Sequence, residues 1–489
     1  MAPNTDSSAD IEAAAQKLLG FKSLRPGQRE AIQGLLDRRD TLLVQPTGSG
    51  KSAVYQIAGS LLAGSTLVVS PLIALQKDQA DSIEATKLDE SAVVNSALST
   101  GEQRETLQRI EGGEVEYILL APEQLRKPET LDRLRAAGIS LFAIDEAHCI
   151  SQWGHDFRPD YLELAHAIEA LDHPAVLAMT ATASKEVREE IIDKLGMRNP
   201  LAIVMGFDRP NISLRVDHFG QPDEKFEALF KRVEFAEKPG IIYVATRKHA
   251  EMIAAELNQR GINAVFYHGG LKAKDRDQIQ DRFMSGKVPV IVATNAFGMG
   301  VDKPDIRFVY HADVSDSLDA CYQELGRAGR DGKPAEAVLF YRPGDISAQR
   351  YKTGAGQVNT ADLQALTDSL LSHGETASLQ QLSHDTSLSQ RKILNLLHKL
   401  EPLGVAGKLP SGEIRLIQKK NPDEMLEAAR RQQEFQKNLR KRRLQQMQQY
   451  AETRACRREF LLRYFGDSFT GPCGNCDNCD TNVTAAAAG

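Results

Sequence analysis

The stretch Val44-Gln45-Pro46-Thr47-Gly48-Ser49-Gly50-Lys51-Ser52 decides the fold of this chain. It follows the apolar run 41–44, which predicts a buried strand, and it leads into residues 53–58, which predict a helix. A glycine-rich turn between a strand and a helix points backbone N–H groups and the positive end of the helix at one place, where phosphate binds. The sequence therefore predicts a phosphate-binding loop at the edge of a sheet.

Each residue type in this loop has an expected role. Gly48 and Gly50 let the backbone approach the phosphates, Lys51 reaches the β- and γ-phosphates, and the Ser52 hydroxyl is a ligand for Mg²⁺. The strict pattern has glycine where this chain has Gln45, so the loop is a looser variant. The alternative interpretation is a Gly/Ser-rich loop that carries an incidental lysine.

The composition sets the class of protein. With 489 residues, 42% hydrophobic and 26% charged, the chain is long enough for several globular domains. Its apolar runs fall short of membrane-spanning length, and residues 1–10 are polar and acidic, unlike a signal peptide. We therefore expect an intracellular protein without a membrane partner. The net charge of −6 indicates no overall affinity for nucleic acid, so any such surface must be local.

Two regions alternate strand-like and helical stretches, which is typical of a parallel sheet covered by helices. In the first region, residues 1–205, apolar runs occur at 42–44, 66–69, 117–120, 141–144 and 175–179. The second region, residues 206–345, opens with a predicted linker at 206–211 and has runs at 240–244, 264–267, 290–293, 308–311 and 336–341. Two such lobes form a cleft at the carboxyl ends of their strands, where ligands of open α/β sheets bind.

Charged residues that suit nucleotide hydrolysis occur in both lobes. Asp145 and Glu146 directly follow the run 141–144; Asp145 is expected to hold the Mg²⁺ that bridges the nucleotide phosphates, and Glu146 to orient or deprotonate the attacking water. Arg327 and Arg330 stand three apart in a glycine-flanked segment, on one helix face or its edge. We expect them to stabilise the transferred phosphoryl as an arginine finger does. The hydroxyls of residues 180–183 suit either a relay of nucleotide state or plain packing.

The pattern becomes helical after the second lobe. Residues 355–420 predict two helices and then a hairpin around 410–412, which resembles a winged helix that binds DNA; a helical protein-interaction module is the alternative. Residues 421–482 predict one or two long helices rich in arginine and lysine, either a solvated face or a site for phosphate contacts. Residues 483–489 are predicted to be a disordered tail.

Four of the six cysteines gather near the end of the chain, at Cys456, Cys473, Cys476 and Cys479. Four thiolates suit a tetrahedral Zn²⁺, and the expected intracellular setting argues against disulfides. A redox-active disulfide cluster is the alternative.

The phosphate loop, the Asp-Glu-Ala-His motif at 145–148, Thr-Ala-Thr at 180–182 and the two arginines together resemble superfamily 2 helicases. Three further stretches are similar to RecQ DNA helicases in particular: the aromatic-rich loop 148–161, Phe-Asp-Arg-Pro-Asn at 207–211 and Ala-Phe-Gly-Met-Gly at 296–300. The cysteine spacing also matches the zinc site of that family. The similarity covers residues 16–345 and resumes over 450–480.

This resemblance implies an α/β fold with two tandem RecA-like parallel-sheet lobes, then the winged-helix-like segment and a helical zinc-binding module. It implies an ATP-dependent helicase that unwinds DNA in the 3′ to 5′ direction in recombination, repair or replication restart. The expected cofactors are ATP, Mg²⁺ and Zn²⁺. The expected partners are single-stranded DNA and duplex junctions, with single-strand-binding or repair proteins. The expected location is the cytoplasm, at a bacterial nucleoid, or a eukaryotic nucleus; no oligomeric state is implied.

The family motifs also assign roles to individual residues. Catalysis is expected from Lys51, Asp145, Glu146, Arg327 and Arg330, with Arg330 as the finger. Trp153, His155, Phe157 and Arg158 match the loop that couples DNA binding to hydrolysis, because aromatic rings stack on unpaired bases whatever their identity. The residues expected to contact the nucleotide are Phe21 as a stacking ring, Arg25 and Gln28 at the base, and Gly48, Ser49, Gly50, Lys51 and Ser52 at the phosphates.

The chain departs from the family pattern in its C-terminal part. Family members usually place the zinc module directly after the second lobe, whereas here the winged-helix-like segment precedes it. The predicted turn at 410–412 also lacks an aromatic wedge. Two other functions stay open on sequence grounds: an RNA-remodelling ATPase, since the lobe motifs are shared across superfamily 2, and a nucleic-acid-binding scaffold with an inactive ATPase.

Overall fold

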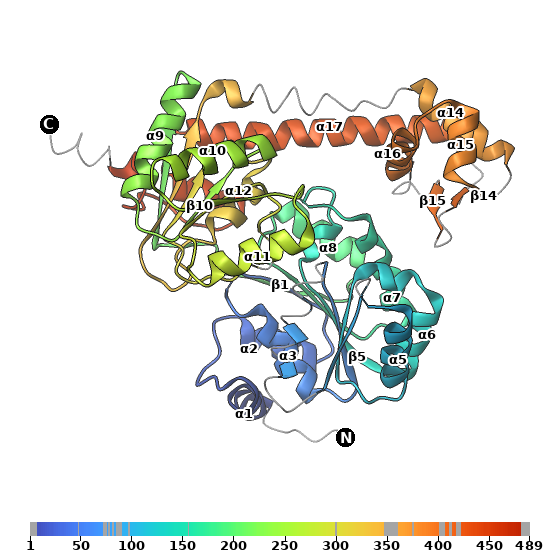
Figure 1. Cartoon of the computed structure of the whole chain (residues 1–489). Coiled ribbons are helices and arrows are strands. Elements are labelled where there is room, and N and C mark those ends of the chain that lie inside the picture. Colours follow the sequence, from blue (N-terminus) through green and yellow to red (C-terminus); the bar gives the residue numbers. More distant parts are fainter. Residues whose placement is uncertain are drawn as a thin grey trace. The chain divides into compact units, whose positions relative to one another are not determined.

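The computed structural model describes residues 7–46, 48–71, 76, 79–80, 83–84, 90–95, 98–154, 156–298, 301–346, 360–373, 376–400, 406–409, 413–416 and 422–480. Residues 1–343 and 447–489 form one compact unit, and residues 344–446 form a second. Figure 1 shows the elements of both, coloured along the chain.

The first lobe is built on a seven-stranded parallel sheet with the strand order β3-β4-β2-β5-β6-β1-β7. The five predicted runs are confirmed in β1, β2, β4, β5 and β6, and β3 and β7 are additional edge strands. Its strands are β1 (Thr41–Val44), β2 (Ser65–Val69), β3 (Ser91–Val94), β4 (Tyr117–Leu120), β5 (Ile139–Ile144), β6 (Ala175–Thr180) and β7 (Leu201–Val204).

Local signals set the ends of the helices on this sheet. A capping box of Ser99 and Glu102 begins α5, Ser184 caps α8, and Gly138 at φ 71° ends α6. Buried residues of α1, α2 and α3 share one apolar core with inward-facing residues of the strands. The helices are α1 (Ser7–Leu19), α2 (Gln28–Leu36), α3 (Lys51–Leu61), α5 (Thr100–Glu111), α6 (Pro128–Ala137), α7 (Leu164–Ala170) and α8 (Lys185–Leu195), with 3₁₀ turns η1 (Pro122–Arg126), η2 (Ala147–Ile150) and η3 (Pro159–Glu163).

The second lobe is a six-stranded parallel sheet with the order β10-β11-β9-β12-β13-β8. Strand β8 was not predicted; it follows the linker directly and forms one edge. Helices α9 and α10 contribute to the apolar core of this lobe. The elements are β8 (Ile212–His218), α9 (Pro222–Phe235), β9 (Gly240–Tyr243), α10 (Arg247–Gln259), β10 (Ala264–Tyr267), α11 (Ala273–Met284), β11 (Val290–Ala293), β12 (Phe308–His311), α12 (Leu318–Leu325) and β13 (Ala335–Tyr341).

The second unit contains short helices and a small antiparallel sheet with the order β14-β16-β15. The predicted helix–helix–hairpin order is present in α15, α16, β15 and β16, whereas α14 and β14, which precede them, were not predicted. The buried leucines and isoleucines of this unit form a separate core. The predicted turn at 410–412 lies outside the described residues. The elements are α14 (Thr360–Ser372), β14 (Thr376–Ala377), α15 (Leu379–Thr386), α16 (Gln390–Leu400), β15 (Ala406–Lys408) and β16 (Ile414–Leu416).

Two further helices follow in the described part of the chain, within the segment that the sequence predicts to be helical. Helix α17 (Pro422–Glu452) belongs to the second unit up to Gln446 and to the first unit from Met447, and α18 (Arg457–Tyr464) follows it. The predicted tail, residues 483–489, lies outside the described residues. None of the described helices combines the length and the hydropathy that crossing a membrane requires.

Candidate nucleotide and zinc sites

The predicted phosphate loop leaves the carboxyl end of β1, which lies between β6 and β7 in the sheet. Gly48 and Gly50 have φ values of 81° and 83°, in the left-handed region that glycine tolerates, and α3 begins at Lys51. The Lys51 ammonium donates to the backbone oxygens of Gln45, at 2.9 Å, and Pro46, at 3.3 Å. The loop therefore has the strand–turn–helix geometry that the sequence predicts. Thr47 lies outside the described residues.

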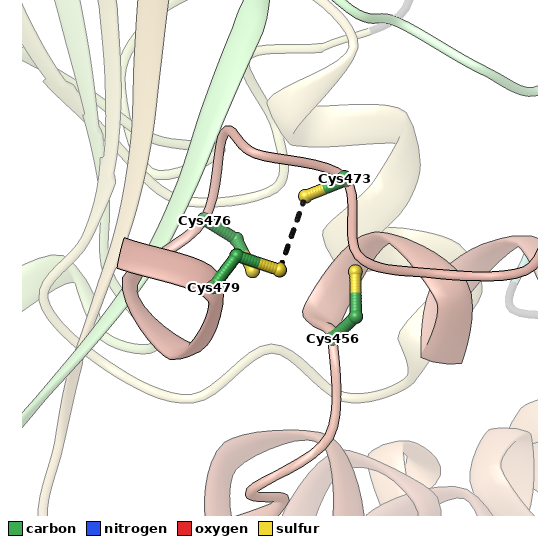
Figure 2. Close-up of side chains that lie close together, drawn as sticks. All are labelled: Cys456, Cys473, Cys476 and Cys479. Atoms are coloured by element: carbon green, nitrogen blue, oxygen red, sulfur yellow. Dashed lines mark hydrogen bonds between the residues drawn. The ribbon is translucent and has the colours of Figure 1, made fainter. Parts of the chain in front are cut away.

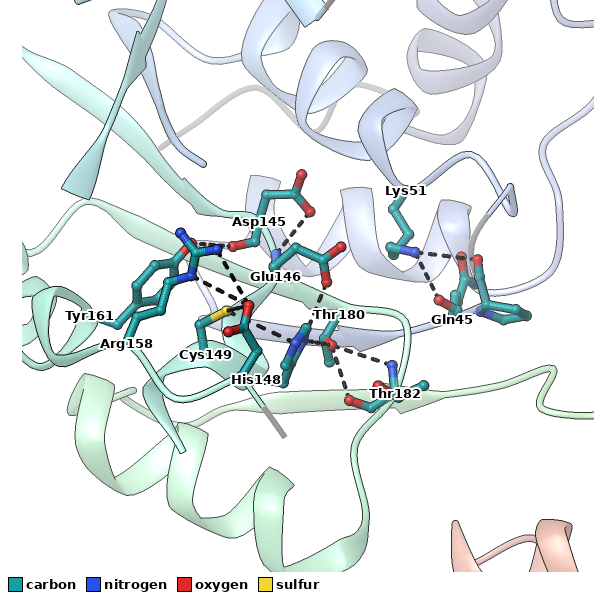
Figure 3. Close-up of polar contacts among 12 residues, drawn as sticks. Gln45, Lys51, Asp145, Glu146, His148, Cys149, Arg158, Tyr161, Thr180 and Thr182 are labelled. Atoms are coloured by element: carbon teal, nitrogen blue, oxygen red, sulfur yellow. Dashed lines mark hydrogen bonds and ion pairs between the residues drawn. The ribbon is translucent and has the colours of Figure 1, made fainter. Parts of the chain in front are cut away.

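The Lys51 side chain is half-buried, and charged groups act on its ammonium; Figure 3 shows Asp145 and Glu146 among them. Burial lowers its pKa, the carboxylates of Glu146 and Asp145 raise it, and the guanidinium of Arg330 lowers it again. A phosphate anion at this place would favour the charged form of the lysine and offset the burial. The electrostatics of the loop thus suit an anionic ligand.

The turn at residues 24–28 is fastened to the phosphate loop. Arg25 Nη1 donates to the backbone oxygen of Gly48 at 2.6 Å, and Gln28 Nε2 donates to that of Gly50 at 2.9 Å. Gln45 Nε2 donates to the backbone oxygen of Pro26 at 2.9 Å, so the residue that departs from the strict loop pattern braces this turn.

This turn was expected to contact the base of the nucleotide. Its two polar side chains, Arg25 and Gln28, donate to loop carbonyls, and their contact with the base stays a prediction. Phe21 keeps 37% of its surface exposed, which leaves its ring available for stacking.

The two predicted carboxylates follow β5 at the same edge of the sheet. Asp145 accepts from Gln79 Nε2 at 3.2 Å and from the backbone N–H of Glu146 at 2.9 Å. Burial and the neighbouring Glu146 charge raise the pKa of Asp145 to about 6. Two adjacent, half-buried acids are a donor set that fits a divalent cation.

Glu146 has a strained backbone and a polar relay behind it. Its φ and ψ of 48° and 44° lie in the left-handed region, which costs on the order of 1–3 kcal/mol for a non-glycine residue and is typical of functional sites. Its Oε2 lies 3.2 Å from Nδ1 of His148, and the same nitrogen lies 2.9 Å from the Thr180 hydroxyl oxygen (Figure 3). That hydroxyl donates to the backbone oxygen of Thr182 at 3.1 Å.

The polar contacts of Thr180 favour a relay role for the Thr-Ala-Thr segment over plain packing, and that role stays a prediction. The Thr180 hydroxyl is bonded into the network of Glu146, so packing alone does not describe its environment. His148 was not predicted as a site residue, although its place within the Asp-Glu-Ala-His motif was the available signal.

The aromatic-rich loop is tied to the carboxylates and to α8. The Tyr161 hydroxyl donates to the backbone oxygen of Asp145 at 3.0 Å, and the Ser151 hydroxyl donates to Glu190 at 2.5 Å. The Arg158 guanidinium, expected at DNA, donates to the backbone oxygen of Pro71 at 2.9 Å. Trp153 and Phe157 are half-buried. His155, Met299 and Gly300 lie outside the described residues.

The two predicted arginines lie in the loop after α12, which ends at Leu325, rather than on its face. The linker holds this loop: Arg209 donates to the backbone oxygens of Gly326 and Ala328, each at 2.8 Å. Asn211 Nδ2 donates to the backbone oxygen of Gly329, also at 2.8 Å. The linker motif therefore positions the arginine loop.

Arg330 reaches the phosphate loop of the first lobe. A Cβ on Gly48 would lie 3.5 Å from Arg330 Cδ. Arg330 Nη1 donates to the backbone oxygen of Val301 at 2.9 Å and to Asp302 at 2.6 Å, whereas its buried Nε and Nη2 have no hydrogen-bond partner among the described residues. Arg327 Nε is also buried and has no hydrogen-bond partner among the described residues. Buried donors of this kind call for a ligand.

The four C-terminal cysteines converge at one point (Figure 2). Their sulfur atoms all lie within 4.8 Å of one another, and those of Cys473 and Cys479 are 3.9 Å apart. A tetrahedral Zn²⁺ with Zn–S bonds of about 2.3 Å places its sulfurs about 3.8 Å apart. The donor set and its spacing fit zinc.

Residues 456–480, which contain the four cysteines and α18, are called the zinc region here. This region is hydrogen-bonded to the edge strand β8 of the second lobe. The backbone N–H of Leu214 donates to the oxygen of Asn475 at 3.2 Å, and that of Val216 donates to Asp477 at 3.1 Å. Asn475 Nδ2 also donates to the backbone oxygen of Pro210 in the linker at 2.9 Å.

A phosphate loop, an acidic pair and an opposed arginine on two parallel sheets define a two-lobed, nucleotide-driven helicase fold. The sequence matches the family described as DEAD/DEAH box helicase over residues 25–190 and the helicase conserved C-terminal domain over 224–332. It also matches the RecQ zinc-binding family over 415–480.

Curated relatives narrow the assignment. A Bacillus subtilis protein described as a probable ATP-dependent DNA helicase RecS is 43% identical, over 69% of this chain and 68% of that protein. The ATP-dependent DNA helicase RecQ of Haemophilus influenzae is 34% identical over 94% of this chain and 62% of its own length. That of Bacillus subtilis is 41% identical over 69% and 58%. The chain belongs to the RecQ family of ATP-dependent DNA helicases, and it spans about three fifths of the two RecQ proteins.

Solved structures agree with the fold. The Mycobacterium smegmatis helicase Lhr, bound to single-stranded DNA and AMP-PNP, aligns with a TM-score of 0.55 at 20% identity over 86% of this chain and 62% of that one. Dbp5 of S. cerevisiae, bound to RNA and ADP BeF3, aligns with a TM-score of 0.55 at 20% identity over 70% and 90%. These likenesses concern the fold alone.

Proposed function

We propose that this chain is an ATP- and Mg²⁺-dependent helicase that moves 3′ to 5′ along one DNA strand and unwinds duplexes in recombination, repair or replication restart. The observation that carries the proposal is Arg330, which packs beside Gly48 of the phosphate loop and whose buried Nε and Nη2 have no hydrogen-bond partner among the described residues. Family membership supports DNA as the substrate, and the RecQ-like motifs support the polarity.

The chain's own residues account for hydrolysis. ATP supplies the phosphoryl group whose transfer to water drives the movement. Lys51 and the loop N–H groups bind the phosphates, Glu146 orients the attacking water and accepts its proton, and Arg330 stabilises the charge that develops on the phosphoryl group. His148 holds the Glu146 carboxylate at 3.2 Å and so fixes its direction.

Asp145 and Ser52 would hold the Mg²⁺ ion. Burial and then the charge of Glu146 raise the pKa of Asp145, and a divalent cation bound there would offset both effects. The four cysteines would hold Zn²⁺ and fix the C-terminal knuckle to α18.

For DNA, Trp153 and Phe157 are the proposed stacking residues. Their loop reaches Asp145 through Tyr161, which gives a short route from a bound base to the hydrolytic site. Exposed cations on α17, namely Lys437, Arg440 and Lys441, add a surface for phosphate contacts. Stacking and phosphate contact both ignore base identity, so we propose binding without sequence preference.

The test compares ATP turnover without nucleic acid, with single-stranded DNA and with RNA. We expect strong stimulation by DNA and loss of turnover in Lys51→Ala. Duplexes with a 3′ or a 5′ tail then report polarity, with the 3′-tailed one unwound. Preferential stimulation by RNA would favour the RNA-remodelling alternative, and absence of turnover would favour the scaffold.

A further inference from the structure

Arg188 joins the segment behind the Thr-Ala-Thr motif to the zinc region. It lies on α8, and its Nη1 is 3.0 Å from the backbone oxygen of Ala183 and 3.0 Å from that of Phe465. Gly466 has a φ of 85°, and a Cβ there would lie 3.2 Å from Arg188 Nη2. The glycine therefore lets the guanidinium approach the end of α18.

Phe465, whose backbone oxygen accepts from Arg188, packs against the linker and against the second lobe. It is fully buried, and its ring stacks on Phe207 with centroids 4.8 Å apart and planes 14° apart. Its ring also lies 4.7 Å from Tyr322 of α12, and the Tyr322 hydroxyl donates to the backbone oxygen of Phe207. Arg188 thus binds a residue that packs against the linker and the second lobe.

Other bonds hold the zinc region to the linker and to the second lobe. Arg458 donates to Asp208 at 2.8 Å and to the backbone oxygen of Ile212 at 2.7 Å. The Tyr464 hydroxyl donates to Asp319 of α12. A displacement of the second lobe relative to the first would therefore stretch or break the hydrogen bond between Arg188 and Phe465.

The first-lobe end of this bond lies close to the hydrolytic residues. Ala183 follows the Thr-Ala-Thr segment, whose Thr180 contacts His148, and His148 contacts Glu146. Contacts are therefore continuous from Glu146, through α8 and Arg188, to the linker.

We propose that Arg188 is a positioning residue that couples ATP hydrolysis to movement of the lobes by holding the zinc region against the first lobe. It acts through the backbone of Phe465, and the inference rests on the proposed helicase function. Its loss leaves the phosphate loop, the carboxylates and Arg330 in place. Hydrolysis then continues, but less of it is converted into strand separation.

The experiment uses the full chain and measures ATP turnover, base pairs unwound per ATP and zinc content on the same preparations. In Arg188→Ala we expect turnover close to wild type, unchanged zinc and about 10-fold fewer base pairs per ATP, within the usual range for coupling between sites. Arg188→Lys keeps one donor and should recover part of the loss. Lys185→Ala is the matched control, an exposed cation on the same helix.

An Arg188→Ala protein with the wild-type yield of base pairs per ATP would overturn the proposal. A parallel loss of turnover and zinc would do so too, because it would assign Arg188 to the fold alone. A second readout needs no unwinding: fluorescent labels on Lys194→Cys and Phe235→Cys, both exposed, report lobe movement when a non-hydrolysable ATP analogue binds. A smaller change in Arg188→Ala supports the proposal and an equal change overturns it. A wild-type chain that unwinds no DNA would contradict the helicase function, while this comparison still tests Arg188.

Discussion

The Arg330 side chain of the second lobe packs against Gly48 of the phosphate loop, where a Cβ would lie 3.5 Å from Arg330 Cδ and 4.0 Å from its Nε. Gly48 also has a φ of 81°, so its backbone conformation favours glycine. The contact brings a second-lobe cation to the loop that carries Lys51. We therefore expect the nucleotide to bind between the two lobes, where Arg330 meets the phosphate loop.

Arg330→Ala should lower kcat for ATP by on the order of 1,000-fold or more, the usual effect of removing an arginine finger, while the affinity for ATP changes little. The reason is that charge on the transferred phosphoryl grows only in the transition state. Steady-state hydrolysis and equilibrium nucleotide binding measure the two effects. Lys333→Ala, at an exposed cation in the same loop region, is the control and should behave as wild type. An Arg330→Ala enzyme with wild-type kcat would remove Arg330 from the mechanism.

Gln45→Gly restores the strict loop pattern but removes the bond from Gln45 Nε2 to the backbone oxygen of Pro26. We expect KM for ATP to rise about 2- to 10-fold at unchanged kcat, because one buried hydrogen bond contributes roughly 0.5–1.5 kcal/mol. Titration of turnover against ATP measures this. Gln33→Ala is the control, because the Gln33 side chain donates to the exposed Asp37 carboxylate instead. Unchanged KM would mean that the bond does not position the turn at residues 24–28.

The strands that the sequence predicts correctly are those with continuous apolar runs, because a strand buried on both faces needs apolar side chains at every position. Strands β3, β7 and β8 were missed, and all three lie at sheet edges; β7 and β8 also have part of their side chains in contact with solvent, whereas β3 is mostly buried but only four residues long. The mixed patterns of β7 and β8 carry a weaker signal. The phosphate loop, the acidic pair and the cysteine cluster could also be predicted, because each is recognised from a short local motif or from a characteristic spacing.

What could not be predicted are contacts between residues far apart in the sequence. Arg188 meets Phe465, and Arg458 meets Asp208, across more than two hundred positions. Similarly, Gln45 appeared as a departure from a motif until its bond to the turn at 26 was seen. Such contacts depend on the tertiary packing of the chain, which local sequence patterns do not predict.

Removal of zinc should destabilise the segment 473–479 that carries three of the four cysteines. Wild-type chain should contain about one zinc per chain, and Cys476→Ser should lose most of it and unfold at a lower temperature, because the metal joins α18 to the segment that pairs with Leu214. Elemental analysis and thermal melts measure the two changes. Cys321→Ala, at a buried thiol in α12 outside the cluster, should keep its zinc. Full zinc content in Cys476→Ser would contradict a four-cysteine site.

The second lobe should lose stability at low pH through Asp313. Burial alone would raise its pKa, but its hydrogen bond with His249 and the charge of Lys225 outweigh burial and hold the pKa below the ordinary value of 3.8. A depressed pKa contributes stability above the unfolded value and loses it as the pH falls through the folded value.

Asp313→Asn should therefore reduce the free energy of unfolding by roughly 1–3 kcal/mol at neutral pH, the cost of a broken buried network. The difference from wild type should shrink as the pH falls below 3.8. Denaturant titrations at several pH values measure it. Glu251→Gln, which pairs with His268 but is 54% exposed, should show no such pH-dependent difference. A constant Asp313→Asn effect at all pH values would refute the assignment.

Trp153, the only tryptophan in the chain, makes the DNA-coupling loop directly observable. Because its backbone N–H lies 3.1 Å from the Ser151 hydroxyl, which bonds Glu190, the ring is presented from an anchored loop. We expect single-stranded DNA to quench its fluorescence by base stacking. Trp153→Ala should keep basal ATP turnover while DNA stimulation falls about 10-fold, consistent with 1–3 kcal/mol per stacked base. Phe235→Ala removes an aromatic ring that is 85% exposed on α9 and should leave stimulation intact. Unchanged fluorescence together with wild-type stimulation of Trp153→Ala would place the DNA contact elsewhere.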